Sequence, residues 1–136
     1  MVTPREKQMN NIVHMAIVVN DYDEAIEYYT KILNFCLLED KDMGAGKRWV
    51  RVAPSANAAF SLLLAKAKND HQQKYVGDQT GGRVFIFYHV DDFWAEYNRM
   101  QQLGVDFTEQ PREEDYATVV VFRDLYGNKW DMIQPR

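Results

Sequence analysis

Cysteine is almost absent from this sequence, and so are long apolar runs. Cys36 is the only cysteine among 136 residues, which excludes a disulfide within the chain and a zinc site built from several cysteines. Such a residue is typical of a small apolar side chain in a reducing compartment. No apolar run approaches the length of a membrane span, and the polar opening "MVTPREKQMNN" lacks the apolar core of a signal peptide. We therefore expect a cytoplasmic protein with no membrane partner.

Positive charge is also scarce. The chain has 16 Lys and Arg residues against 20 Asp and Glu, a net charge of −4 without long runs of either sign. Nucleic-acid binding requires a basic stripe that neutralises phosphates, so we expect no nucleic-acid partner. A chain of 136 residues fits a single domain, residues 1–136, that buries roughly two-thirds of its unfolded surface. It needs no disulfide or structural metal to fold.

An internal repeat is the most informative feature that is present. The segment "HMAIVVNDYDEAIEYYTKILNF", which begins at His14, has the same organisation as "FIFYHVDDFWAEYNRMQQLGV", which begins at Phe85. Each gives an apolar strand, a break that ends in aspartate, and a helix with apolar residues three and four positions apart. The apolar helix positions are Tyr22, Ile26, Tyr29 and Leu33 in the first copy and Phe93, Tyr97, Met100 and Leu103 in the second. The sequence therefore predicts two copies of one structural unit.

Capping residues predict where both helices begin and end. Asp21 and Asp92 immediately precede the helices and can accept hydrogen bonds from the N–H groups of the first turn. Glu24 is placed to complete a capping box with Asp21. Asn34 and Gly104 follow the last apolar helix positions and suit the left-handed conformation that closes a helix.

Three further strand-like stretches follow each helix. They are "FCLLED", "KRWVRVAP" and "AAFSLLLAKA" in the first half and "VDFTEQ", "ATVVVFRD" and "NKWDMIQP" in the second. We therefore predict an α+β fold in which two βαβββ modules in tandem, residues 12–66 and 83–134, form a cupped mixed sheet. Residues 67–82 between them are polar and aperiodic, which is typical of a linker or of a segment that also folds over a site.

The last strand contains one acid among apolar residues. In "FRDLYGNKWDMIQP", residues 124–128 predict a tight turn and residues 129–133 a strand that includes Asp131. Burying an unpaired carboxylate costs several kcal/mol. Asp131 is therefore expected either on a solvated face or in a site.

The repeat, His14 at the head of the first strand, and the terminal "DLYGNKWDMIQP" resemble the vicinal oxygen chelate superfamily over roughly residues 12–134. This superfamily includes glyoxalase I, extradiol dioxygenases, fosfomycin-resistance enzymes and bleomycin-resistance proteins. The resemblance implies a cupped sheet, usually closed by a second chain, with metal ligands on four inner strands. It places the ligand positions at His14, Ser61, Phe85 and Asp131. His14 matches the family pattern, whereas serine replaces Glu or Gln, phenylalanine replaces His, and aspartate replaces Glu.

Too few donors remain at these positions to bind a metal. Zinc takes three or four donors, and non-haem iron takes two histidines and one carboxylate. His14 and Asp131 alone do not suffice, and His89 lies about 13 Å along the strand from Phe85. We therefore expect no metal cofactor. His14 and Asp131 would form a general acid–base pair or remain as an inert remnant of the ligand set.

Strand alternation indicates which other residues could contact a ligand. Phe85, Phe87 and His89 alternate onto one face; if that face also carries His14, it forms an aromatic cup of the kind that binds small molecules. Core packing is the alternative for the two phenylalanines, and hydrogen bonding to neighbouring groups is the alternative for His14.

The other members of the candidate ligand-binding set are Ser61, Tyr116, Trp49 and Arg48. Ser61 would offer a hydroxyl, and Tyr116 lies where the second module's hairpin approaches the cup. Arg48 and Arg51 flank Trp49, and at most one arginine shares the face that the tryptophan occupies. An arginine that faces the cup would favour an anionic ligand, whereas a solvated arginine is the alternative.

Three functions fit these features. The first is a dimeric, metal-free protein of the bleomycin-resistance kind that binds a small molecule in the cup between two chains. The second is a glyoxalase-type lyase or isomerase, or a dioxygenase, with a metal site rebuilt from residues such as Asp70, His71 or Asp78. The third is a non-catalytic module whose cup only forms the homodimer contact.

Overall fold

The computed structural model describes residues 10–136. The first module contains β1 (His14–Val19), α1 (Tyr22–Glu27), the π-helix η1 (Tyr28–Ile32), β2 (Cys36–Gly44), β3 (Lys47–Ala53) and β4 (Ser61–Lys66). Its strands form a four-stranded sheet, sheet A, in the order β1-β4-β3-β2. Only the β1–β4 pair is parallel, as a βαβββ unit requires.

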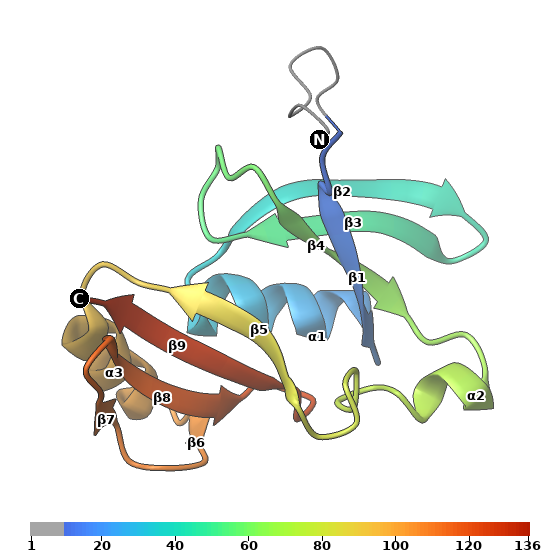
Figure 1. The fold of residues 1–136 in the computed structure, drawn as a ribbon. Coiled ribbons are helices and arrows are strands. Elements are labelled where there is room, and N and C mark those ends of the chain that lie inside the picture. Colours follow the sequence, from blue (N-terminus) through green and yellow to red (C-terminus); the bar gives the residue numbers. More distant parts are fainter. Residues whose placement is uncertain (1–9) are drawn as a thin grey trace, which may run out of the picture.

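The second module repeats this organisation (Figure 1). After α2 (Asp70–Gln73) come β5 (Val84–His89), α3 (Phe93–Gln102), β6 (Asp106–Phe107), β7 (Arg112–Glu113), β8 (Ala117–Arg123) and β9 (Lys129–Pro135). Sheet B has the order β5-β9-β8-β6, with β7 also paired to β8. The predicted α+β fold of tandem modules is confirmed, with two separate mixed sheets in the chain. Within residues 10–136, no helix is long and apolar enough to cross a membrane.

The predicted helix ends are confirmed by the backbone. Asp21 accepts from the N–H of Glu24 at 2.8 Å, and Asp92 accepts from the N–H of Ala95 at 3.2 Å. Asn34 and Gly104 have positive φ angles of 62° and 82°. The predicted capping box does not form, because the Glu24 carboxylate instead accepts from the Tyr126 hydroxyl at 2.8 Å.

One strand of the second module is shorter than its sequence predicts. The stretch "VDFTEQ" forms only the two-residue β6, and the chain rejoins β8 as the equally short β7. Pro111 lies between them and has no N–H to donate. The Glu109 carboxylate accepts from the N–H of Val121 in β8 at 3.1 Å, in the place of a backbone carbonyl from a neighbouring strand.

The core lies between the helices and the covered face of each sheet. Buried side chains from both modules form one cluster, and α1 lies under sheet A in Figure 1. Its continuation η1 carries Tyr29, which packs on Trp130 of sheet B with ring centroids 6.0 Å apart. On the other module, Arg99 of α3 donates to the carbonyl of Ile32 at 2.9 Å. The two modules therefore pack as one body.

A buried carboxylate, Asp124, fixes the contact between the modules. It is 5% exposed and accepts from the Tyr29 hydroxyl at 2.8 Å and from Trp130 Nε1 at 3.1 Å. The backbone N–H groups of residues 126, 127 and 128 also donate to its second oxygen. Burial and then the charge of Asp124 raise the pKa of Tyr29, which keeps the phenol protonated as a donor.

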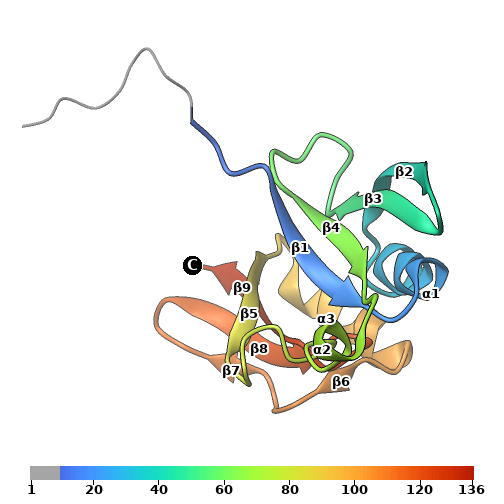
Figure 2. The same ribbon diagram turned by 90° about the vertical axis from the view of Figure 1, so that its right-hand side faces the viewer.

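The segment of residues 67–82 is more than a linker. It contains α2 and runs from the end of β4 back to the start of β5 (Figures 1 and 2). Gln79 Oε1 accepts from the N–H of Val18, on the free edge of β1, at 2.7 Å, while its own N–H donates to Asn128 at 3.0 Å. Gly77, with φ of +79°, lies against the turn formed by residues 124–128. A Cβ at this position would lie 1.8 Å from the carbonyl oxygen of Tyr126.

Asp124→Ala is expected to destabilise the protein by about 3 kcal/mol or more, since it leaves several buried donors without an acceptor. Urea unfolding followed by tryptophan fluorescence measures the change. The control is Asp115→Ala, which removes an exposed aspartate and should alter stability by less than about 0.5 kcal/mol. Equal stability of both variants would contradict the role assigned to Asp124.

Candidate functional site

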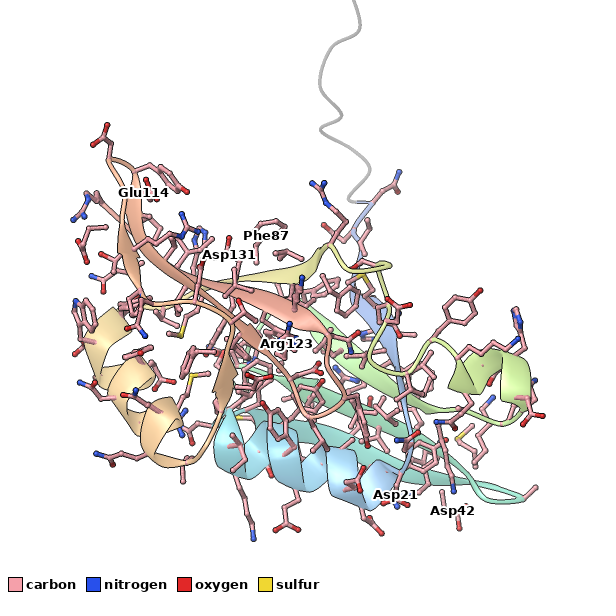
Figure 3. The ribbon with its side chains drawn as sticks, turned by 90° about the horizontal axis from the view of Figure 1, so that it is seen from below. Asp21, Asp42, Phe87, Glu114, Arg123 and Asp131 are labelled. Carbon is pink, nitrogen blue, oxygen red and sulfur yellow. The ribbon has the colours of Figure 1, made fainter. Side chains whose placement is uncertain are left out.

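Each sheet has one face that the helices do not cover. On sheet A this face, called open face A, carries the side chains that alternate with the buried core positions. Its polar and aromatic members come from all four strands and are His14, Glu39, Trp49, Arg51 and Ser61. The corresponding side of sheet B, called open face B, carries Phe87 and Asp131, which lie on the side away from α1 (Figure 3).

Arg51 joins the polar side chains of open face A. Its Nη1 donates to Ser61 Oγ at 3.1 Å, and its Nε donates to Glu39 Oε1 at 2.5 Å. Ser61 Oγ lies 2.9 Å from His14 Nδ1. Trp49 Nε1 also donates to Glu39, at 3.0 Å, and the indole lies edge-on to the imidazole at 5.9 Å. These five residues form one connected set, the Arg51 network.

The direction of each hydrogen bond follows from the available donors. A guanidinium can only donate, so Ser61 Oγ accepts from Arg51. Ser61 keeps a proton and a second lone pair, so the direction of its bond with His14 Nδ1 is set by the imidazole tautomer. The hydrogen bond from Arg51, and then that from Trp49, lowers the pKa of Glu39. The network therefore pairs one cation, Arg51, with one anion, Glu39.

The structure decides which arginine shares the Trp49 face. Arg51 lies there, and Arg48 lies on the helix side of β3. The Arg48 guanidinium bonds Asp23 at 2.9 Å and Asp40 at 2.7 Å and lies over the Tyr22 ring, 5.2 Å from its centroid. The hydrogen bonds that Arg48 donates to Asp40, and then to Asp23, raise the pKa of Arg48. Arg48 is thus held in an ion-pair cluster away from open face A.

On open face B, Phe87 lies opposite Asp131 in the β5–β9 register. Phe87 is 66% exposed. An irregularity in the pairing between Val84 and Ile86 interrupts the alternation, and Phe85 packs against the core cluster. In this stretch β5 has one more residue than β9, and this extra residue turns Phe85 toward the core. The prediction that Phe85 and Phe87 share a face is therefore wrong.

A groove of about 400 Å³ runs along open face B beside Phe87. Its lining residues are Gly82, Arg83, Val84, Phe87, Thr108, Val121 and Lys129. The walls are apolar and the charged rim is basic, which is compatible with a small organic ligand.

Asp131 is half-buried, and its Oδ1 has no hydrogen-bond partner among residues 10–136. Desolvation raises the pKa of Asp131, while the Arg112 guanidinium lowers it and the Glu109 carboxylate raises it further. A carboxylate oxygen that is removed from water without a partner is costly. The burial of this oxygen is therefore not compensated by any group of the described chain.

The other candidate residues lie apart from the Arg51 network. His89 lies in a surface hollow with residues 90–92 at the end of β5, and Tyr116, in the turn before β8, is 64% exposed. His71 of α2 contacts the ring of Tyr75 at 5.4 Å. Sequence reasoning missed the role of Glu39, although its register opposite Arg51 could be read from the β2–β3 hairpin once that pairing is known.

The residues at the four family ligand positions do not fit a divalent metal. Ser61 already accepts from a guanidinium, Phe85 has no donor atom, and no contact links His14 with Asp131, which lie on different sheets. Among residues 10–136, no group of three or more His, Cys, Asp or Glu side chains could hold an ion, and this includes Asp70, His71 and Asp78. The acid–base pair of His14 and Asp131 is not formed within one chain.

Asp131→Asn is expected to stabilise the chain at pH 7. The folded state raises the pKa of Asp131 above its ordinary value of 3.8, so it binds the proton more tightly than the unfolded state does. Stability is therefore lost as pH rises through the folded-state pKa. The gain of the variant, measured by urea unfolding, should shrink toward zero as the pH falls to 3.8. A variant less stable than the parent at pH 7 would show that the carboxylate is paired in the native protein.

Comparisons with known proteins agree with this architecture. Residues 11–132 match the profile of the Glyoxalase/Bleomycin resistance protein/Dioxygenase superfamily. An uncharacterized protein of Shewanella frigidimarina (strain NCIMB 400) is 54% identical over 125 residues, which cover 91% of this chain and 93% of the relative.

Two solved structures show the same fold. The crystal structure of UcmS2 is 27% identical, with a TM-score of 0.80 over 93% of this chain and 98% of that one. TnmS3, an antibiotic binding protein from Streptomyces sp. CB03234, is 25% identical, with a TM-score of 0.75 over 94% of this chain and 98% of its own. The chain belongs to the glyoxalase/bleomycin resistance protein/dioxygenase superfamily.

Proposed function

We propose that the protein binds a small organic molecule between the open faces of two copies of the chain, without a catalytic metal. The observation that carries this proposal is the Arg51 guanidinium, which donates to Ser61 at 3.1 Å. Ser61 stands at a position where the family pattern has a metal ligand, and next to it this chain places a guanidinium that is paired with Glu39. A guanidinium cannot coordinate a metal ion, whereas it can donate hydrogen bonds to an organic ligand.

A second copy of the chain is supported by what the open faces leave exposed. Phe87 on face B is 66% exposed, and Ile12, just before β1, is 81% exposed. Burying these large apolar groups would favour association, and two open faces of opposite modules can enclose one cavity.

The chemistry of the two faces defines what such a cavity would bind. Trp49 and Phe87 offer aromatic walls for a flat or apolar ligand. The Arg51 guanidinium offers hydrogen-bond donors, the His14 imidazole offers a ring nitrogen, and Asp131 offers a carboxylate. TnmS3, which is 25% identical to this chain, is an antibiotic binding protein. This similarity supports the proposal that the present chain also binds a small organic molecule. The metal-dependent lyase or dioxygenase alternative has less support, since the donor set is incomplete.

Phe87→Glu is expected to prevent association, because it would bury a carboxylate at an apolar contact. Sedimentation velocity at micromolar concentration should give a species of about twice 16.0 kDa for the parent and a monomer for the variant. Leu103→Glu, which alters an exposed apolar residue after α3, should still associate. A parent chain that sediments as a monomer at these concentrations would contradict the two-chain cavity.

Arg51→Gln is expected to weaken ligand binding about tenfold or more, because it removes a charged hydrogen-bond donor. Thermal shifts across a library of small aromatic natural products identify compounds that stabilise the parent. The charge-matched control is Lys31→Gln on η1, whose side chain is 73% exposed. No stabilising compound, or equal shifts in parent and Arg51→Gln, would contradict the proposed cavity.

A further inference from the structure

The strands β3 and β4 separate before they end. Their pairing covers only Val50 to Val52 opposite Leu62 to Leu64, although β3 begins at Lys47 and β4 continues to Lys66. The N–H of Arg48 donates to the Tyr22 hydroxyl at 3.2 Å rather than to a strand. A side chain of α1 thus replaces a ladder bond at the point where the strands diverge.

A pocket of about 470 Å³ opens in this gap, and we call it the β3–β4 slot. Its lining residues are Tyr22, Ala45, Gly46, Lys47, Arg48, Trp49, Leu63, Leu64, Ala65, Lys66, Ala67, Lys68 and Gln72. The volume lies in the range of small-molecule sites. Four lining residues are basic and none is acidic, although the chain carries 20 acidic against 16 basic residues.

Three of these basic residues have charge available for a ligand. Arg48 is already neutralised by Asp23 and Asp40. Lys47, Lys66 and Lys68 are exposed, and within residues 10–136 none of the three forms an ion pair. They extend from both sides of the gap, since the first lies on β3 and the others lie at the end of β4. An anion in the slot would therefore interact with positive charge from two directions.

The apolar part of the slot determines the rest of the ligand. Leu63 and Ala65 line it from β4, and Trp49 lines it from β3. The Trp49 indole is oriented by its hydrogen bond to Glu39 at 3.0 Å, so its ring is positioned before a ligand arrives. An aromatic ring can pack against it at little cost in side-chain entropy.

We propose that the β3–β4 slot is a binding site for aromatic anions, with the ring against Trp49 and Leu63 and the acidic group among Lys47, Lys66 and Lys68. This site is additional to the cavity proposed between two chains. Arg51, Phe87 and Asp131 do not line the slot, and Trp49 is the residue that both sites share.

The test uses 8-anilinonaphthalene-1-sulfonate, an aromatic anion whose fluorescence rises on binding, with N-phenyl-1-naphthylamine as its neutral counterpart. The sulfonate should bind saturably, one per chain, and about tenfold more tightly than the neutral compound. Its affinity should fall as salt rises from low to physiological concentration. Equal affinity of the two compounds, or no salt dependence, would overturn the proposal.

Variants locate the site. The double variant Lys66→Gln with Lys68→Gln should weaken sulfonate binding about tenfold, while Lys31→Gln with Lys74→Gln removes the same charge outside the slot and should not. Trp49→Phe should abolish most of the tryptophan quenching caused by the dye, and Trp94→Phe should not. Circular dichroism and urea unfolding confirm that each variant is folded.

Two further variants separate this proposal from the cavity between chains. If the slot binds the dye, Arg51→Gln and Phe87→Glu should both retain sulfonate binding. This holds even if Phe87→Glu prevents association and Arg51→Gln no longer binds the compounds found in the thermal-shift library. If instead Arg51→Gln abolishes dye binding and the Lys66 and Lys68 substitutions leave it unchanged, the dye occupies the cavity between chains and the slot proposal is overturned.

Discussion

The carboxylate of Asp124 is the interaction on which the rest of the structure depends. A buried charge is tolerated only when donors surround it, and here they come from η1, from the turn before β9, and from β9 itself. The bond from Tyr29 attaches the first module to the second, and the backbone bonds fix the turn that starts the last strand. The position of Asp131, seven residues further on, follows from that turn.

Packing both helices into one shared core has a consequence for the opposite faces. The side chains of α1, η1 and α3 cover one face of each sheet, so these helices leave the opposite face of each sheet uncovered. The exposed Phe87 and the unpartnered oxygen of Asp131 lie on the uncovered side. The same arrangement that stabilises the monomer therefore leaves two surfaces suited to binding.

The sequence allows the repeat, the helix ends and the βαβββ order of elements along the chain to be predicted, because caps and periodicity depend on near neighbours. Asp21, Asp92, Asn34 and Gly104 act as expected. The inward turn of Phe85 could not be predicted, since alternation assumes an unbroken ladder. The Arg51 network depends on register across four strands, which a single sequence does not reveal. Asp131 was placed in the right strand, but its surroundings depend on Arg112 of β7 and on Glu109 shortly before it.

Ser61 stands where the family pattern has Glu or Gln, and the neighbouring Arg51 explains the consequence of this difference. A glutamate at position 61 would lie within reach of the guanidinium and would form an ion pair with it, so restoring that acid alone would not restore a metal ligand. Serine is short enough to bond both Arg51 and His14. Glu39 balances the guanidinium from β2. The four strands thus hold a paired charge, a hydroxyl and an imidazole on open face A, where a carboxylate at position 61 would instead compete with Glu39 for Arg51.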